Sequence, residues 1–271
     1  MKSSNIWVAK TTDMQGLALI SDKLSIFYQK KLSVSIKGEE DYEFTLARVE
    51  KHDGMFIGSM FKYKKEQRIQ SFYPTTRAVE TEKTKGHPLI ADAYFCLIDN
   101  FIMVEEKPPH FGHVMIIKII KRMADEIEMI KDFEFEFINS KLEIDNIFKQ
   151  ITMEKIKYIR FKDIKENQRP EKKSLQLFED LSIGTKSKSI EFGNPREGLN
   201  PNASYIEGGK ILAQENKANI KIETETGNGE KKVYDTTEAR NKIRERIEYK
   251  DETERKFKII DIFKKLFNKL K

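Results

Sequence analysis

The sequence predicts an α+β fold: a mainly antiparallel sheet built from hairpins, with helices packed on one face, plus a C-terminal amphipathic helix. Three observations lead to this prediction. Within residues 92–122 the apolar pattern changes from two short runs to a helical period, which indicates two strands followed by a helix. Residues 133–137 alternate phenylalanine with glutamate, as a half-buried strand does. Residues 257–271 carry apolar side chains at helical spacing.

The centre of the predicted fold is a hairpin followed by a helix. Residues 93–97 and 101–104 are apolar runs joined at Asp99-Asn100, and both of these residue types tolerate the positive φ of a tight turn. Pro108-Pro109 ends the second strand because proline cannot donate to a β-ladder. After Gly112 the apolar positions follow one helical face. They are Val114, Ile117, Ile120 and Ile127.

The residues before this centre predict strands and one further hairpin. Residues 6–9 and 18–20 are short apolar runs and are predicted as strands. His52-Asp53-Gly54 separates two apolar segments, and Asp-Gly is a strong hairpin signal. The polar residues 62–86 are predicted to form a long exposed connection.

The residues after this centre predict helices at 142–148 and 203–214 and a strand at 156–161. Gly227-Asn228-Gly229 predicts a third, exposed hairpin. Thr236-Thr237 can cap a helix that follows it. We therefore divide the chain into three parts: an α+β core domain (1–182), a region of basic loop, hairpin and helix (183–250), and the amphipathic helix (251–271).

Composition limits the class of protein. The 271 residues are 38% hydrophobic and 35% charged, so a core can form under a very polar surface. Cys96 is the only cysteine, which excludes an intrachain disulfide or a cysteine-based zinc site. No signal peptide or membrane-spanning run is visible. We expect a cytoplasmic protein, at most peripheral to the inner face of the membrane.

The positive charge is concentrated at the C-terminal end. Residues 240–271 contain twelve Lys or Arg and six Asp or Glu, which equals the net charge of +6 of the whole chain. An excess of this kind favours an anionic partner, either nucleic acid or a membrane surface. Lysine and arginine that contact phosphates release counterions. The predicted nucleic-acid-binding residues, with DNA favoured over RNA, are Lys186, Lys188, Arg196, Lys231, Lys232, Arg240, Lys242, Arg244 and Arg246.

No catalytic residue, metal site or cofactor is predicted. His110 and His113 stand three residues apart, but a pair this short is more often accidental than a metal site. Asp92 and Asp99 resemble nuclease carboxylates with a nearby lysine, yet a turn-forming or solvent-exposed role is several times commoner. The alternative to a DNA-binding protein is therefore a nuclease-like or RNA-targeting toxin effector, which would need a cluster that the sequence does not display.

Residues 257–271 have three possible partners for their apolar stripe: the same domain, a second copy in a homodimer, or an anionic membrane surface. A partner protein is a variant of the second. Packing against protein is favoured over membrane, because apolar stripes at this spacing are usually packing faces.

Two parts of the sequence resemble known protein families. The segment 137–237, with Gly198-Leu199-Asn200-Pro201 and the Thr236-Thr237 pair, resembles an uncharacterised bacterial family known as a domain of unknown function. The earlier layout, in which a His-Asp-Gly hairpin precedes a second hairpin and Phe111 opens a helix, resembles RexA-type phage-exclusion proteins and, more distantly, KwaB-type defence proteins. This resemblance implies a sequence-tolerant, dimeric DNA-binding protein of an anti-phage type.

Overall fold

The computed structural model describes residues 1–11, 14–65, 68–73, 78–83, 89–129, 134–162, 190–194, 196–238 and 241–270. The chain forms two compact units: unit 1 comprises Met1–Phe137 and Arg244–Lys271, and unit 2 comprises Ile138–Ile243. This division differs from the predicted parts 1–182, 183–250 and 251–271. The reason is that a strand near the C-terminus pairs with the first strand of the chain, so both ends of the sequence belong to unit 1.

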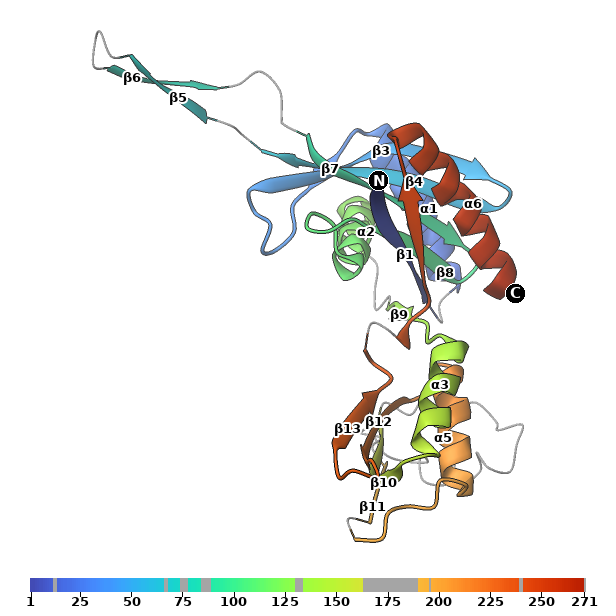
Figure 1. Cartoon of the computed structure of the whole chain (residues 1–271). Helices are drawn as coiled ribbons and strands as arrows, with labels where there is room; N and C mark the ends of the chain where they lie inside the picture. Colours follow the sequence, from blue (N-terminus) through green and yellow to red (C-terminus); the bar gives the residue numbers. More distant parts are fainter. Residues whose placement is uncertain are drawn as a thin grey trace. The chain divides into compact units, whose positions relative to one another are not determined.

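Unit 1 is built on an eight-stranded antiparallel sheet (Figure 1). Its order is β14-β1-β8-β7-β4-β3-β2, and β9 also pairs with β1. Both β14 and β9 lie on the edge of β1 opposite to β8, because β8 pairs with the same β1 residues. The strands are β1 (Lys2–Lys10), β2 (Ser33–Val34), β3 (Tyr42–His52), β4 (Met55–Lys64), β7 (Leu89–Ile98), β8 (Phe101–Glu106), β9 (Glu136–Phe137) and β14 (Arg244–Tyr249).

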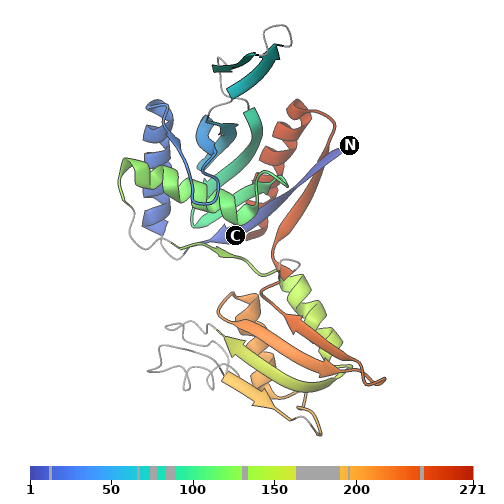
Figure 2. The same ribbon diagram turned by 90° about the vertical axis from the view of Figure 1, so that its left-hand side faces the viewer.

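Helices α1 (Met14–Gln29) and α2 (His113–Ile127) cover one face of this sheet (Figure 2). The prediction of a strand at 18–20 is wrong, because a longer apolar stripe at helical spacing runs through these residues. Its members are buried in the core between helices and sheet. They are Leu17, Ile20, Leu24 and Phe27.

Helix α6 (Glu252–Leu270) lies on the opposite face of the same sheet (Figure 1). The alternation of β7 shows the two sides: Phe95 packs in the core under α1 and α2, whereas Asp92 accepts a hydrogen bond from Arg255 of α6. The apolar stripe of α6 is buried in unit 1. Its members are Ile259, Phe263, Leu266 and Phe267. The fold class is as predicted, including the amphipathic C-terminal helix.

Both predicted hairpins of unit 1 are confirmed. Asp53 has a φ of 50° between β3 and β4, and Asp99 has a φ of 51° between β7 and β8, the left-handed values that these turns require. The predicted connection 62–86 contains a further hairpin, formed by β5 (Arg68–Tyr73) and β6 (Ala78–Lys83). The predicted strand 133–137 is shortened to β9, and Phe133 lies outside the described residues.

Unit 2 is a four-stranded antiparallel sheet, ordered β11-β10-β12-β13, with α3 (Lys141–Ile151) and α5 (Ser204–Gln214) packed on one face (Figure 1). Its strands are β10 (Lys155–Lys162), β11 (Ile190–Gly193), β12 (Asn219–Glu225) and β13 (Lys231–Asp235). The predicted helices at 142–148 and 203–214, the strand at 156–161 and the exposed hairpin are therefore confirmed.

The helix predicted after Thr236-Thr237 is wrong. The Thr237 amide and hydroxyl donate to the carboxylate of Asp235 in a tight turn, and residues 244–249 form the strand β14. Residues 245, 247 and 249 of β14 alternate with exposed charged residues, which is a strand period.

Gly209 tests the packing of unit 2. A Cβ at this position would lie 2.0 Å from the Cε1 atom of Phe161, which is fully buried. Glycine to alanine inside a helix ordinarily stabilises it by about 1 kcal/mol. Here we expect Gly209→Ala to lower the free energy of unfolding of unit 2 by about 1–3 kcal/mol through overpacking. Urea unfolding measures it, with Gly227→Ala, which meets no atom within 4 Å, as the control. A variant more stable than wild type contradicts the packing.

Candidate functional site

The predicted basic residues are divided between the two units. In unit 2, Lys232 forms an ion pair of 3.2 Å with Glu154, and Lys242 donates a 2.7 Å hydrogen bond to the side chain of Asn139. Lys231 and Arg196 are exposed. Lys186, Lys188 and Arg240 lie outside the described residues. Two members of the set are therefore engaged within unit 2.

Arg244 and Arg246 lie on β14 of unit 1 and face the same side of the sheet. In the register with β1, Arg244 stands opposite Trp7, Arg246 opposite Asn5 and Glu248 opposite Ser3. Side chains directly opposite each other in a ladder share a face. We call the exposed and half-buried residues of this face the edge surface. It consists of Ser3, Asn5, Arg244, Arg246 and Glu248.

The arginines of the edge surface are weakly neutralised. Arg246 lies 3.4 Å from Glu248, and both side chains are largely exposed, so the pair contributes little energy. The guanidinium of Arg244 lies over the ring of Trp7, with 5.8 Å between its carbon and the ring centre. Arg244 forms no ion pair with any residue that the structure describes. Both cations remain available to an anionic ligand.

A histidine–glutamate pair borders the edge surface. The Nδ1 atom of His113, the first residue of α2, lies 2.7 Å from a carboxylate oxygen of Glu106 at the end of β8. The indole of Trp7 and the side-chain amide of Asn5 donate to the other oxygen at 2.8 and 3.4 Å. Trp7 also stacks on the imidazole at 4.0 Å, and Phe137 contacts that ring edge-on at 4.8 Å.

These contacts keep Glu106 ionised. Burial raises the pKa of its carboxyl group, but the hydrogen bonds from His113, Trp7 and Asn5 outweigh burial and hold the pKa below its usual value. The imidazole is thus fixed by a carboxylate and two aromatic rings, while its side chain stays 23% exposed.

The other face of the sheet contains a buried ionic network around Arg255 of α6. Its side chain is fully buried, as is that of Glu105. The guanidinium uses all five of its N–H groups: two bind Glu105 at 2.6 and 2.8 Å, two bind the carboxylate and carbonyl of Asp92, and one binds Glu252. The rings of Tyr94 and Tyr249 contact the cation at 5.1 and 5.7 Å.

Both carboxylates of the network are satisfied as well. Glu105 also accepts hydrogen bonds from the Ser4 hydroxyl and the Tyr94 amide. Lys107 lies 2.9 Å from Asp92. Burial raises the pKa of Asp92, but Lys107 and Arg255 outweigh it, so the net pKa is lowered. The stability contributed by Asp92 is therefore present above its unfolded-state pKa and is lost as the pH falls through the folded-state value.

The ionic network occupies one of the candidate nuclease-like carboxylates, Asp92. Asp92 does lie next to a lysine, but the guanidinium of Arg255 is bound between Asp92 and Glu105, where a cation bridging the two carboxylates would sit. Asp99 is an exposed turn residue, and the His110 amide donates to the carbonyl of Lys107. The described ranges hold no group of three or more His, Cys, Asp or Glu placed to bind a metal ion.

The apolar stripe of residues 257–271 is occupied by its own unit. Ile259 and Phe263 of α6 are fully buried, which is the first of the three arrangements considered for this stripe. Phe257 is 71% exposed and stands apart from the stripe. In the part of the chain that the structure describes, no helix combines the length and apolarity needed to cross a membrane.

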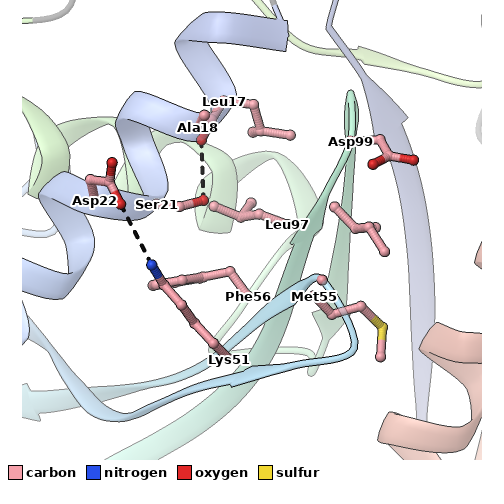
Figure 3. A pocket seen from close by; sticks show the side chains of 11 residues that line it. Leu17, Ala18, Ser21, Asp22, Lys51, Met55, Phe56, Leu97 and Asp99 are labelled. Atoms are coloured by element: carbon pink, nitrogen blue, oxygen red, sulfur yellow. Dashed lines mark hydrogen bonds and ion pairs between the residues drawn. The ribbon is translucent and has the colours of Figure 1, made fainter.

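A cavity of about 430 Å³ opens between α1 and the turns of the two hairpins in unit 1 (Figure 3). Its apolar wall includes Leu17, Phe56 and Leu97, and an ion pair of 3.6 Å joins Asp22 and Lys51 at its mouth. The Ser21 hydroxyl donates to the Leu17 carbonyl. The cavity can hold a small apolar group, but its polar side chains are arranged for no evident reaction.

Comparisons with protein-family models, with curated proteins and with solved structures find no match to this chain. Sequence reasoning missed Trp7, Glu105, Glu106 and Arg255 as members of clusters. The available signal was the adjacent pair Glu105-Glu106 at the end of an apolar strand. Adjacent strand residues face opposite sides of a sheet, so the pair places one carboxylate on each side.

Removing the Arg255 side chain alone is predicted to destabilise unit 1 strongly. Arg255→Met leaves the charge of Glu105 buried without its partner, which ordinarily costs about 3–5 kcal/mol. We expect that loss in the free energy of unfolding, and a smaller loss in the double variant Arg255→Met/Glu105→Gln. Chemical denaturation measures both. Lys265→Met, an exposed position on the same helix, should stay within about 0.5 kcal/mol of wild type. An Arg255→Met loss below about 1 kcal/mol would show that the network contributes little.

Proposed function

We propose that the chain is a sequence-tolerant nucleic-acid-binding protein, with duplex DNA favoured, and that the edge surface of unit 1 contacts the phosphate backbone. The observation that carries this proposal is the pair of exposed arginines, Arg244 and Arg246, on the face of the edge strand β14 that points away from α6. Guanidinium groups suit phosphate because their N–H groups match two phosphate oxygens.

The spacing of the two arginines supports a polymeric anion. Residues two apart on a strand are separated by about 6.6–6.8 Å, which is close to the distance between successive phosphates of a nucleic-acid strand. Asn5 and Ser3 stand opposite or beside these arginines in the ladder and supply neutral hydrogen-bonding groups, which are common in backbone contacts. No groove-reading helix is needed for such contacts, so little dependence on base sequence follows.

The distribution of charge supports the same part of the chain. Residues 240–271 account for the whole net charge of +6, and the described members of this range from Arg244 onward belong to unit 1. In unit 2, several basic residues of the sheet are paired with acids, as in Lys157 with Glu225 and Arg160 with Glu191. Unit 2 is accordingly a weaker candidate for backbone binding.

The biological setting is part of the proposal and rests on the resemblance to RexA-type and KwaB-type proteins. It adds an anti-phage role and a homodimeric state. Because the apolar stripe of α6 is buried in its own unit, a dimer contact or an anionic membrane contact of residues 257–271 would have to use Phe257 and the exposed lysines instead. Neither contact is needed for the binding of nucleic acid at the edge surface.

Salt dependence tests the edge surface. For wild type, the logarithm of the affinity for a 30-base-pair duplex should fall linearly with the logarithm of salt concentration. Arg244→Gln/Arg246→Gln should reduce the magnitude of that slope by up to about 1.8, since each lost phosphate contact removes about 0.9. Fluorescence anisotropy with two unrelated duplex sequences over a sodium chloride series measures it.

Lys231→Gln/Lys232→Gln is the matched control, because it removes the same charge from unit 2. We expect it to leave the slope nearly unchanged. An equal effect of the two double variants, or a strong preference for one duplex sequence, would contradict the assignment of the contacts to the edge surface.

A further inference from the structure

We propose that His113, oriented by Glu106, is the general base of an RNA-cleaving site beside the edge surface. This inference rests on the proposed function, because the same arginines would hold the phosphodiester. It adds a substrate class, RNA, and a reaction, transfer of the backbone phosphate to the neighbouring 2′-hydroxyl.

The hydrogen bonds of His113 decide which nitrogen acts. An ionised carboxylate can only accept hydrogen bonds, and the pKa of Glu106 is lowered. The Nδ1 atom, 2.7 Å from Glu106, therefore carries the proton of the neutral ring, and the Nε2 atom has the free lone pair. Nε2 binds none of the residues that the structure describes. A neutral imidazole held by a carboxylate, with the other nitrogen free, is the arrangement of a general base.

The surroundings of His113 favour an anionic substrate. The guanidinium carbon of Arg244 lies 5.8 Å from the ring centre of Trp7. The imidazole centre of His113 lies 4.0 Å from the same point, so the distance between the guanidinium and the imidazole is at most the sum of these two. His113 also opens α2, whose N-cap residue Gly112 makes no side-chain cap. The first amides of this 15-residue helix carry partial positive charge. Arg244 and His113, the first residue of α2, thus both contact the ring of Trp7.

The imidazole ring of His113 is held more rigidly than the side chain of an ordinary surface residue. Stacking on Trp7 and the edge contact of Phe137 fix the ring plane, and Glu106 is itself fixed by Trp7 and Asn5. Such support is what a base requires to stay within reach of one proton. Glu106 of β8, Trp7 of β1 and Phe137 of β9 contact the imidazole. Arg244 of β14 contacts the same Trp7 ring.

The reaction balances without a co-reactant. The 2′-hydroxyl gives its proton to Nε2 of His113, its oxygen forms a bond to phosphorus, and the bond from phosphorus to the 5′-oxygen breaks. That oxygen takes a proton from water, and His113 returns its proton to water. The products are a 2′,3′-cyclic phosphate and a 5′-hydroxyl. Arg244 offsets the negative charge that develops on the phosphate. DNA has no 2′-hydroxyl, so it would be bound but not cut.

The test compares a single-stranded RNA oligonucleotide with its all-deoxy counterpart in the presence of EDTA, with cleavage and binding measured separately. We expect wild type to cut only the RNA, to leave a 2′,3′-cyclic phosphate, and to slow on acidification because a protonated imidazole cannot act as base. His113→Phe preserves stacking on Trp7 and should lower the cleavage rate at least about 100-fold while binding is retained. Glu106→Gln is the second variant, and His110→Gln is the control that should cut like wild type.

Trp7 supplies an independent readout, because it is the only tryptophan and stacks on His113. Its fluorescence should therefore change when the RNA oligonucleotide binds beside the stacked imidazole. Binding without cleavage by wild type, or equal cleavage by His113→Phe, overturns this inference and leaves the proposed function standing. Failure to bind either oligonucleotide also overturns this inference, whereas the proposed function itself is overturned only if the 30-base-pair duplex is not bound.

Discussion

The structure of unit 1 depends on the buried guanidinium of Arg255. Five hydrogen bonds tie this one side chain to β7, to β8 and to its own helix. A buried arginine is tolerable only when every N–H group and every facing carboxylate oxygen finds a partner, and that condition is met here. The network does not have to add net stability over an apolar core. It does specify where α6 docks, because no other placement would satisfy Glu105 and Arg255 together.

The docking of α6 also sets the position of the edge surface. Strand β14 ends at Tyr249 and α6 begins at Glu252, so the helix and the strand are fixed together. Tyr249 faces α6 and contacts Arg255, whereas Arg244 and Arg246 face the opposite side. Strand β8 connects the two faces in the same way: Glu105 points to the ionic network and Glu106 to His113. Of these two adjacent glutamates, Glu105 binds Arg255 in the ionic network on one face, and Glu106 binds the candidate base His113 on the other.

Much of the fold follows from local patterns in the sequence, but the clusters do not. The turns at Asp53-Gly54 and Asp99-Asn100 and helix α2 depend on near neighbours and were predictable. The predicted apolar stripe of α2 was wrong at Val114, which is exposed, whereas Ile117 and Ile120 are buried as predicted. Helix α1 was not predicted because the apolar run 18–20 was interpreted as a strand, although it belongs to a helical stripe that extends from Leu17 to Phe27. Trp7, Glu106 and Arg244 are brought together only by strand register, and Arg255 looks like one more surface charge on an amphipathic helix until its partners on β7 and β8 are known.

The single cysteine offers the most direct test of the Arg255 network. Cys96 lies on β7 two and four residues beyond Tyr94 and Asp92, so it shares their face under α6, and it is fully buried. Burial raises the pKa of its thiol to about 12, which keeps it unreactive in the folded state. Thiol labelling by a maleimide, followed by mass spectrometry under native conditions, therefore reports the undocking of α6. We expect wild type and Lys265→Met to label slowly and equally, and folded Arg255→Met to label at least tenfold faster. Labelling of Arg255→Met at the wild-type rate would contradict the claim that this arginine holds the helix on the sheet.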